Sequence, residues 1–129
     1  MKVHVPREIK RKVDTVESLK RNLKQFIACC EEGSEPPRIF KQSGRAANGD
    51  VFAPFVALSL HHHHLHRDGD PLLILQKVGD DLYAVALSSH AIYFGDKMAW
   101  LKLHHEAIDW NGCEDLRQEV LAYVTQSNN

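Results

Sequence analysis

Apolar and polar residues alternate with a period of two in the middle of the chain, which predicts extended strands there. Short turns follow at Asp68-Gly69-Asp70 and Gly79-Asp80-Asp81, and they bound two further apolar runs over residues 72–78 and 82–87. Because short turns join these three strands, we expect them to be antiparallel neighbours. If the first strand begins at Val56, its two faces carry separate sets of side chains: Val56, Leu58, Leu60, His62, His64 and His66 on one, and Ala57, Ser59, His61, His63 and Leu65 on the other.

Apolar residues at steps of three and four predict helices on both sides of these strands. The first predicted helix spans residues 14–32, opens with the capping box Asp14-Thr15-Val16-Glu17 and ends at Gly33. After the strands, Asp96 is expected to cap a helix that carries Trp100 and Ile108 and ends at Gly112. A last helix begins near Glu114. The apolar stripe of the first helix is formed by Val16, Leu19, Leu23, Phe26, Ile27 and Cys30.

These elements predict an α+β fold. A short strand around Val3 and Val5 comes first, and a loop over residues 33–50 follows the first helix, so the order is strand, helix, loop, three strands, two helices. Strands that are neighbours in the sequence, with helices grouped outside them, indicate a small antiparallel β-sheet flanked by helices. The 129 residues fit a single domain, 1–129, with one core.

The composition indicates which class of protein and which cellular compartment to expect. Hydrophobic residues make up 43% of the chain, which is enough for a core, and no apolar run reaches membrane-spanning length. We therefore expect a cytoplasmic protein with no membrane association. The three cysteines, Cys29, Cys30 and Cys113, do not predict a disulfide framework.

Charge is unevenly distributed along the chain. The first 24 residues carry eight Lys or Arg against three acidic residues, whereas the remainder is net acidic. A basic N-terminal arm fits phosphates or an acidic partner, and it equally fits an ordinary solvated helix face.

The densest candidate chemistry lies in residues 61–67, which contain five histidines and an arginine. Histidine changes charge near neutral pH, so such a run indicates a proton-transfer site, a metal site or a purification tag. Tags stand at chain termini, whereas this run is interior and is interrupted by Leu65. The face on which these rings lie decides what they can do.

Several motifs together resemble YafO-type toxins of bacterial toxin–antitoxin systems, within the RelE-like group. The resemblance covers about residues 1–94 and leaves 95–129 as a helical C-terminal extension. It departs from the family at Phe40-Lys41-Gln42-Ser43-Gly44-Arg45, where a Gly-Arg-Asp-like stretch is usual. The similar segments are the N-terminal strand, basic stretch and helix, then Glu32-Gly33-Ser34-Glu35-Pro36-Pro37-Arg38-Ile39-Phe40, then His62-His63-His64-Leu65 followed by Pro71, and the strand Leu82 to His90.

This resemblance implies a ribosome-dependent endoribonuclease that cleaves messenger RNA, arrests growth and is neutralised by a cognate antitoxin. Its partners would be mRNA, the ribosome and the antitoxin, and neither a cofactor nor a metal is expected. Cleavage of this kind needs a base for the 2′-OH, an acid for the leaving 5′ oxygen and cations for the phosphate. We predict His62, His64, His90 and Arg67 as catalytic residues, and Arg45, Arg38, Lys41 and Tyr93 as substrate-binding residues.

The spacing of His62 and His64 suggests how they act. His62 and His64 on one strand face would stand roughly 7 Å apart and bracket a phosphate. His90, at the end of the third strand, would approach them if the first and third strands converge. Arg67 or Arg45 would hold the phosphate oxygens in a bidentate contact.

Two other classes of function remain open. The chain is alternatively a non-catalytic binding module, whose basic helix contacts a protein or nucleic acid and whose histidines are buried and structural. It is alternatively a metal-binding protein or metal-dependent hydrolase, in which alternate histidines of the strand hold Zn²⁺ or Ni²⁺ with Asp68 or Asp70 as an added ligand. Tyr83, Trp100 and Trp110 are expected to pack in or beside the core.

Overall fold

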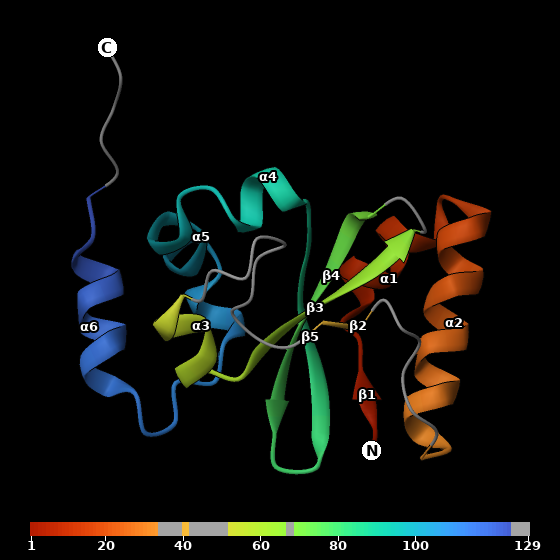
Figure 1. The fold of residues 1–129 in the computed structure, drawn as a ribbon, viewed down its shortest axis with the longest axis horizontal. Helices are drawn as coiled ribbons and strands as arrows, with labels where there is room; N and C mark the ends of the chain where they lie inside the picture. The colour runs from red at the N-terminus through yellow and green to blue at the C-terminus, as the bar shows by residue number, and fades with distance from the viewer. Residues whose placement is uncertain (34–39, 42–51, 67–68, 125–129) are drawn as a thin grey trace.

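A computed structural model describes residues 1–33, 40–41, 52–66 and 69–124 (Figure 1). A five-stranded sheet runs through the molecule in the order β1-β5-β4-β3-β2. The α+β class is therefore confirmed. The strands are β1 (Val3–His4), β2 (Phe40–Lys41), β3 (Leu60–His66), β4 (Gly69–Val78) and β5 (Asp81–Ser88). The helices are α1 (Arg7–Asp14), α2 (Glu17–Glu31), α3 (Ala53–Ala57), α4 (His90–Tyr93), α5 (Lys97–Leu103), the 3-10 turn η1 (His105–Ala107) and α6 (Glu114–Ala122).

The predicted sheet is antiparallel, whereas the observed sheet is mixed. Strands β2 to β5 are antiparallel to their neighbours, but β1 pairs with β5 in parallel. The N-terminal strand adds to the edge that β5 leaves open, and the backbone N–H of Leu82 donates to the carbonyl of Lys2 at 2.8 Å. Nothing in the alternation of Val3 and Val5 fixes that direction, because strand direction depends on where the chain enters the sheet.

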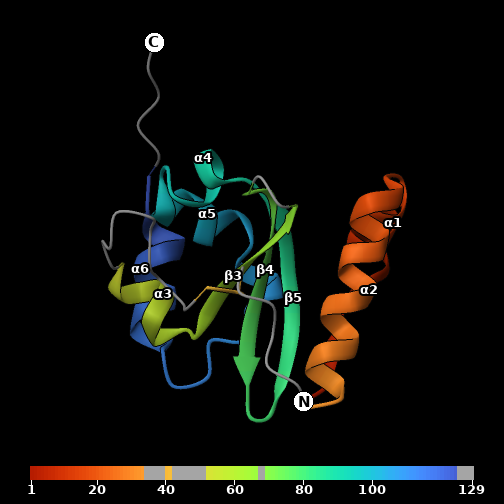
Figure 2. The same ribbon diagram turned by 45° about the vertical axis from the view of Figure 1, so that its right-hand side comes forward.

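Helices cover both faces of the sheet (Figures 1 and 2). Helices α1 and α2 lie on one face, and α3, α4, α5 and α6 lie on the other. The central strand β4 is consequently buried on both sides: every residue of Leu72–Leu75 is fully buried. Burial on two faces explains why this strand has a continuous apolar run instead of an alternating pattern.

The first predicted helix, 14–32, corresponds to α2, and a separate helix that was not predicted, α1, precedes it. Residues Arg7–Asp14 form α1, which buries Ile9 and Val13 at a spacing of four, and α2 begins only at Glu17. The predicted capping box is wrong, because Val16 is the N-cap of α2 and makes no side-chain capping bond. Asp14 instead ends α1, where the hydroxyl of Thr15 donates to the carbonyl of Lys12 at 2.6 Å. The many charged residues around Ile9 and Val13 concealed this short stripe.

The first long strand starts later than predicted. Residues Ala53–Ala57 form α3, which has Pro54 in its first turn and buries Phe55. Ser59 then adopts φ 53°, in the left-handed region, and this turn leads into β3 at Leu60. The alternation of residues 56–59 therefore continues that of β3 without being extended structure. From Leu60 onward the predicted division into two faces holds.

The C-terminal helices are shorter than predicted. Asp96 caps α5 as expected, with its carboxylate accepting from the N–H of Ala99 at 3.1 Å. The helix stops at Leu103, however, and η1 and an irregular segment follow. Gln76 of β4 fastens that segment: its amide nitrogen donates to the carbonyl of Asp109 at 2.8 Å, and its amide oxygen accepts from the N–H of Asp109 at 2.8 Å. Helix α6 begins at Glu114 as predicted.

Within the described residues, no helix combines the length and apolar character that crossing a bilayer requires.

Candidate functional site

Strand β3 divides the histidine run between the two faces of the sheet. His62 and His64 share a face with Leu60, which belongs to the core under α3 to α6. His63 points to the opposite face, where its ring lies 4.0 Å from that of Phe26 in α2, centroid to centroid. The face that carries His62 and His64 is also the one on which the polypeptide turns from β5 into α4.

His90, the first residue of α4, is held in place by Asp70 of β4. One carboxylate oxygen of Asp70 accepts from both the backbone N–H and the ring Nδ1 of His90, each at 2.8 Å. The backbone hydrogen bond is the main reason that the pKa of Asp70 is lowered, and the bond from the ring adds to it. The neighbouring Ser89 caps α4 by accepting from the N–H of Ile92 at 3.2 Å.

The contact with Asp70 also sets the protonation pattern of the His90 ring. Because Nδ1 donates to a carboxylate, Nε2 of the neutral ring carries a lone pair and faces away from Asp70. That Nε2 lies 3.2 Å from Nε2 of His64. Asp70, His90 and His64 thus form a continuous hydrogen-bonded chain from a carboxylate to two imidazoles.

His62 completes a cluster of three rings. One ring nitrogen from each of His62, His64 and His90 lies within 4.8 Å of the others. The ring centroid of His62 is 5.5 Å from that of His64 and 6.2 Å from that of His90. Phe94 packs edge-on against His62 at 5.1 Å and closes the inner side. We refer to His62, His64 and His90 as the histidine cluster.

Access to the cluster is graded from its inner to its outer side. His62 is buried, with only 4% of its surface exposed. His64 is half-buried, and the side chain of His90 is 38% exposed beside the exposed Asp70. An incoming ligand would therefore meet His90 and His64 first.

The fold thus brings together the three histidines predicted from the sequence, but not in the predicted arrangement. The expectation that His62 and His64 bracket a phosphate is wrong, because His62 is covered and the two rings converge. Arg38, Arg45 and Arg67 lie outside the described residues. The backbone of Lys41, in β2, pairs with His62 of β3, and the structure does not describe its side chain.

The prediction that Tyr93 binds substrate is also wrong. Its ring is fully buried and stacks on Phe55 with centroids 4.5 Å apart. Burial raises the pKa of the phenol well above its ordinary value. No nucleotide base can reach a ring in this position, and Tyr93 is part of the core beneath the histidine cluster.

Sequence reasoning did not assign Asp70 as the residue that orients His90. The signal lies in the strand register: Leu72 pairs with Ser88, so continuing the antiparallel ladder places residue 70 opposite residue 90. A register shift between Ile74 and Leu75 lies between that pair and the turn that joins β4 to β5. A regular ladder counted from the turn at Gly79-Asp80 therefore places residue 70 opposite residue 89 instead of residue 90.

A glycine makes room for this arrangement. Gly69 has φ 115°, and a Cβ added there would lie 3.1 Å from Cε1 of His90. Only glycine adopts that backbone conformation at low cost and leaves space for the ring. Gly69 and Asp70 together therefore determine where His90 sits.

The basic residues of the N-terminal arm are exposed on α1 and α2, on the opposite face of the sheet from the histidine cluster. These cations outnumber the acidic residues of the same two helices. The exposed cations are Arg7, Lys10, Arg11, Lys12, Lys20, Arg21 and Lys24.

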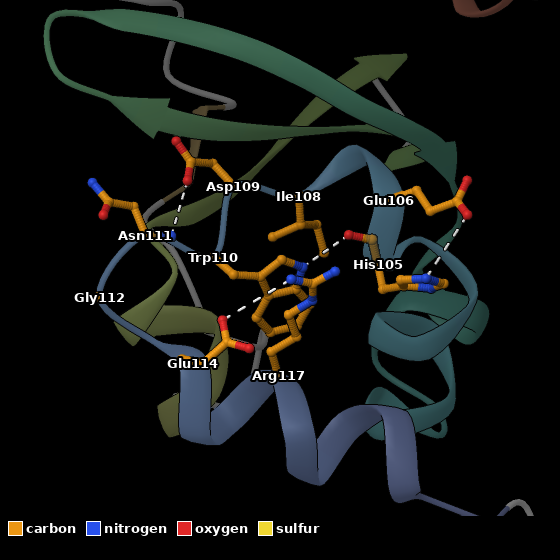
Figure 3. A pocket seen from close by; sticks show the side chains of 9 residues that line it. All are labelled: His105, Glu106, Ile108, Asp109, Trp110, Asn111, Gly112, Glu114 and Arg117. Atoms are coloured by element: carbon orange, nitrogen blue, oxygen red, sulfur yellow. Dashed lines mark hydrogen bonds and ion pairs between the residues drawn. The ribbon is translucent and has the colours of Figure 1, made fainter.

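A separate shallow pocket lies between η1 and α6 (Figure 3). Two of its polar contacts lie within the pocket wall: the indole N–H of Trp110 donates to the carbonyl of His105 at 2.8 Å, and Nη1 of Arg117 lies 4.0 Å from the carboxylate of Glu114. The ring of His105 turns toward Glu106 rather than into the pocket. This pocket lacks the convergence of titratable groups that marks the histidine cluster.

Comparisons with protein-family models, with curated proteins and with solved structures give no match to this chain.

Proposed function

We propose that this protein is an endoribonuclease that cleaves messenger RNA at the ribosome, as the toxin of a toxin–antitoxin pair in the cytoplasm. The observation that carries the proposal is the chain Asp70–His90–His64, in which a carboxylate orients one imidazole against a second at an accessible edge of the fold. Imidazoles in that relation can move protons at neutral pH without any cofactor.

In the proposed reaction, His90 is the base. Its Nε2 takes the proton of the ribose 2′-OH, and the resulting imidazolium is stabilised by the carboxylate of Asp70 on the other nitrogen. The 2′ oxygen then attacks the adjacent phosphorus and the bond from phosphorus to the 5′ oxygen breaks. The products carry a 2′,3′-cyclic phosphate and a 5′-hydroxyl.

His64, in its protonated form, is the acid that gives its proton to the leaving 5′ oxygen. In the free protein its Nε2 contacts His90, so each ring exchanges that contact for an RNA oxygen when substrate enters. His62 is a positioning residue in this scheme because it is buried behind the other two rings. Arg67, which follows His66 in the sequence, stays the residue predicted from the sequence to supply positive charge for the phosphate.

The exposed cations of α1 and α2 support binding to a polynucleotide. Lys and Arg on a surface attract phosphates without regard to sequence, and this attraction weakens as salt rises. Because this face lies across the sheet from the histidine cluster, we assign it to ribosomal RNA, while the mRNA strand lies at His90. The cognate antitoxin would cover one of these two surfaces.

The test is mRNA cleavage in a translating extract, mapped by primer extension, together with growth after induced expression. The wild-type protein should cut mRNA only when ribosomes are present and should leave 5′-hydroxyl ends. His64→Asn and His90→Gln should each slow cutting by about 10²–10⁴-fold, while His61→Asn, in the same run but outside the cluster, should retain it.

Circular dichroism and thermal melting confirm that each variant is folded before its activity is compared. Growth arrest that persists in folded His64→Asn and His90→Gln proteins would contradict the proposal, as would wild-type protein that leaves mRNA intact in the extract.

A further inference from the structure

The histidine cluster has the geometry of a metal centre as well as that of a proton-transfer site. Three imidazole nitrogens converge within 4.8 Å, two from alternate residues of β3 and one from the start of α4. Neutral imidazole is a preferred ligand of zinc and of neighbouring transition metals. The ligand atoms of the cluster all belong to imidazole rings, and no acidic side chain is among them.

The shortest separation matches two ligands of one ion. Zinc–nitrogen bonds of about 2.0–2.1 Å at a tetrahedral angle place two ligand nitrogens about 3.3 Å apart. The Nε2 atoms of His64 and His90 are 3.2 Å apart. One ring nitrogen of His62 lies within 4.8 Å of a ring nitrogen of each of the other two histidines.

Asp70 is the second independent observation. Histidines that bind metals commonly donate their other ring N–H to a carboxylate, which fixes the tautomer and aims the free nitrogen at the ion. Asp70 makes that contact with Nδ1 of His90 at 2.8 Å and also holds the backbone N–H of the same residue. The lone pair of His90 Nε2 is therefore directed toward His64 before any ion binds.

The surroundings suit a site with three protein ligands and one open position. On the inner side, Phe94 packs against His62 at 5.1 Å and Tyr93 lies beneath it at 6.1 Å, centroid to centroid. On the outer side, His64 and His90 are partly exposed, so water or a small ligand can reach a fourth coordination position. An apolar wall behind the ligands and an open front are typical of such sites.

We propose that His62, His64 and His90 bind one zinc ion, with Asp70 orienting His90 and the fourth position open to solvent. This inference goes beyond the proposed function and competes with it for the same atoms, and ion binding is measured without RNA. The two are linked through shared atoms: an ion on the Nε2 atoms of His64 and His90 occupies the nitrogens that would transfer protons.

The experiment uses untagged full-length protein, purified without a metal column, stripped with chelator and titrated with Co²⁺ as a coloured substitute for Zn²⁺. We expect one Co²⁺ per chain, visible absorption of four-coordinate intensity, and displacement of the cobalt by an equimolar amount of Zn²⁺. His90→Gln is the decisive variant, because His90 lies outside the histidine run. It should lose the four-coordinate spectrum and weaken binding by at least about 100-fold.

Two further variants separate a built site from a run of histidines that binds metal as a tag does. Asp70→Asn should weaken Co²⁺ binding by about 10–100-fold while the spectrum keeps its form. His61→Asn removes a histidine from the run but not from the cluster, and should bind as the wild type does. Thermal melting verifies that each variant is folded.

The proposal is overturned if folded His90→Gln protein binds Co²⁺ as the wild type does, or if His61→Asn and His64→Asn weaken binding equally. More than one weakly bound, six-coordinate ion per chain would also overturn it. None of these outcomes bears on RNA cleavage, so a failure here and a failure of the proposed function are distinguishable.

Discussion

His62 and His63 are neighbours in the chain, but their side chains lie on opposite faces of the sheet and in different surroundings. His62 joins His64 and His90 in a polar cluster that opens to solvent at one side. His63, on the opposite face of β3, is 1% exposed and packs on Phe26 of α2. Burial is the main cause that lowers the pKa of His63 to about 3, with the nearby His64 and His62 adding to it. The same residue type therefore belongs to a candidate site on one face of β3 and to the core on the other.

The strongest test of this contrast compares one histidine from each face. Replacing His90 with Gln should lower the rate of RNA cleavage by about 10²–10⁴-fold, because it removes the imidazole that we propose as the base. Replacing His63 with Leu places an apolar side chain of similar volume against Phe26 and should leave the rate within about threefold of wild type. Single-turnover cleavage in the translating extract measures both. A large loss of activity in a folded His63→Leu protein would show that the two faces are not functionally separate.

A phenylalanine ring under His63 should contribute more stability than one beside the histidine cluster. Phe26→Ala removes the fully buried ring beneath His63 and should lower the free energy of unfolding by about 3–5 kcal/mol. Phe94→Ala, on the cluster face, removes a ring that is only partly buried and should cost about 1–2 kcal/mol. Urea denaturation followed by tryptophan fluorescence gives both values. Equal losses would mean that the cluster face is as tightly packed as the α2 face.

A pair of glycines tests whether the position of His90 is set by local space. Gly69→Ala places a Cβ about 3.1 Å from Cε1 of His90, whereas Gly79→Ala has nothing within 4 Å, and both have positive φ. Each substitution should cost about 1–2 kcal/mol of stability from backbone strain. Only Gly69→Ala should also weaken Co²⁺ binding and RNA cleavage, since only it displaces His90. Similar effects of the two substitutions on Co²⁺ binding would contradict this role for Gly69.

The smallest expected effect is a pH dependence that comes from His63. Its folded-state pKa of about 3 lies below the ordinary value of 6.5, so between these values the unfolded chain binds the additional proton. The contribution of His63 to stability is therefore complete above about pH 6.5 and falls as the pH is lowered. From pH 6 to pH 5, the free energy of unfolding should fall by about 1 kcal/mol more in the wild type than in His63→Leu. Parallel curves for the two proteins would mean that folding does not lower the pKa of His63.

The sequence determined the local parts of this structure. The alternation through residues 60–66 placed His62 and His64 on one face, the turn residues at Gly79-Asp80 joined β4 to β5, and steps of three and four located α2. These features depend on neighbours within a few residues, which is the range over which side-chain periodicity carries information. The short helix α1 and the late start of β3 escaped this reasoning because their patterns span too few residues.

The contacts and solvent exposure of the histidines depended on the tertiary structure alone. His90 meets His64 from 26 residues away because Asp70, across the β4–β5 ladder, holds its backbone and its ring. Which face of β3 is sealed depends on the packing of α2 on one side and on where α4 leaves the sheet on the other. A sequence fixes which side chains alternate, but solvent access depends on elements that are distant in the chain and adjacent in space.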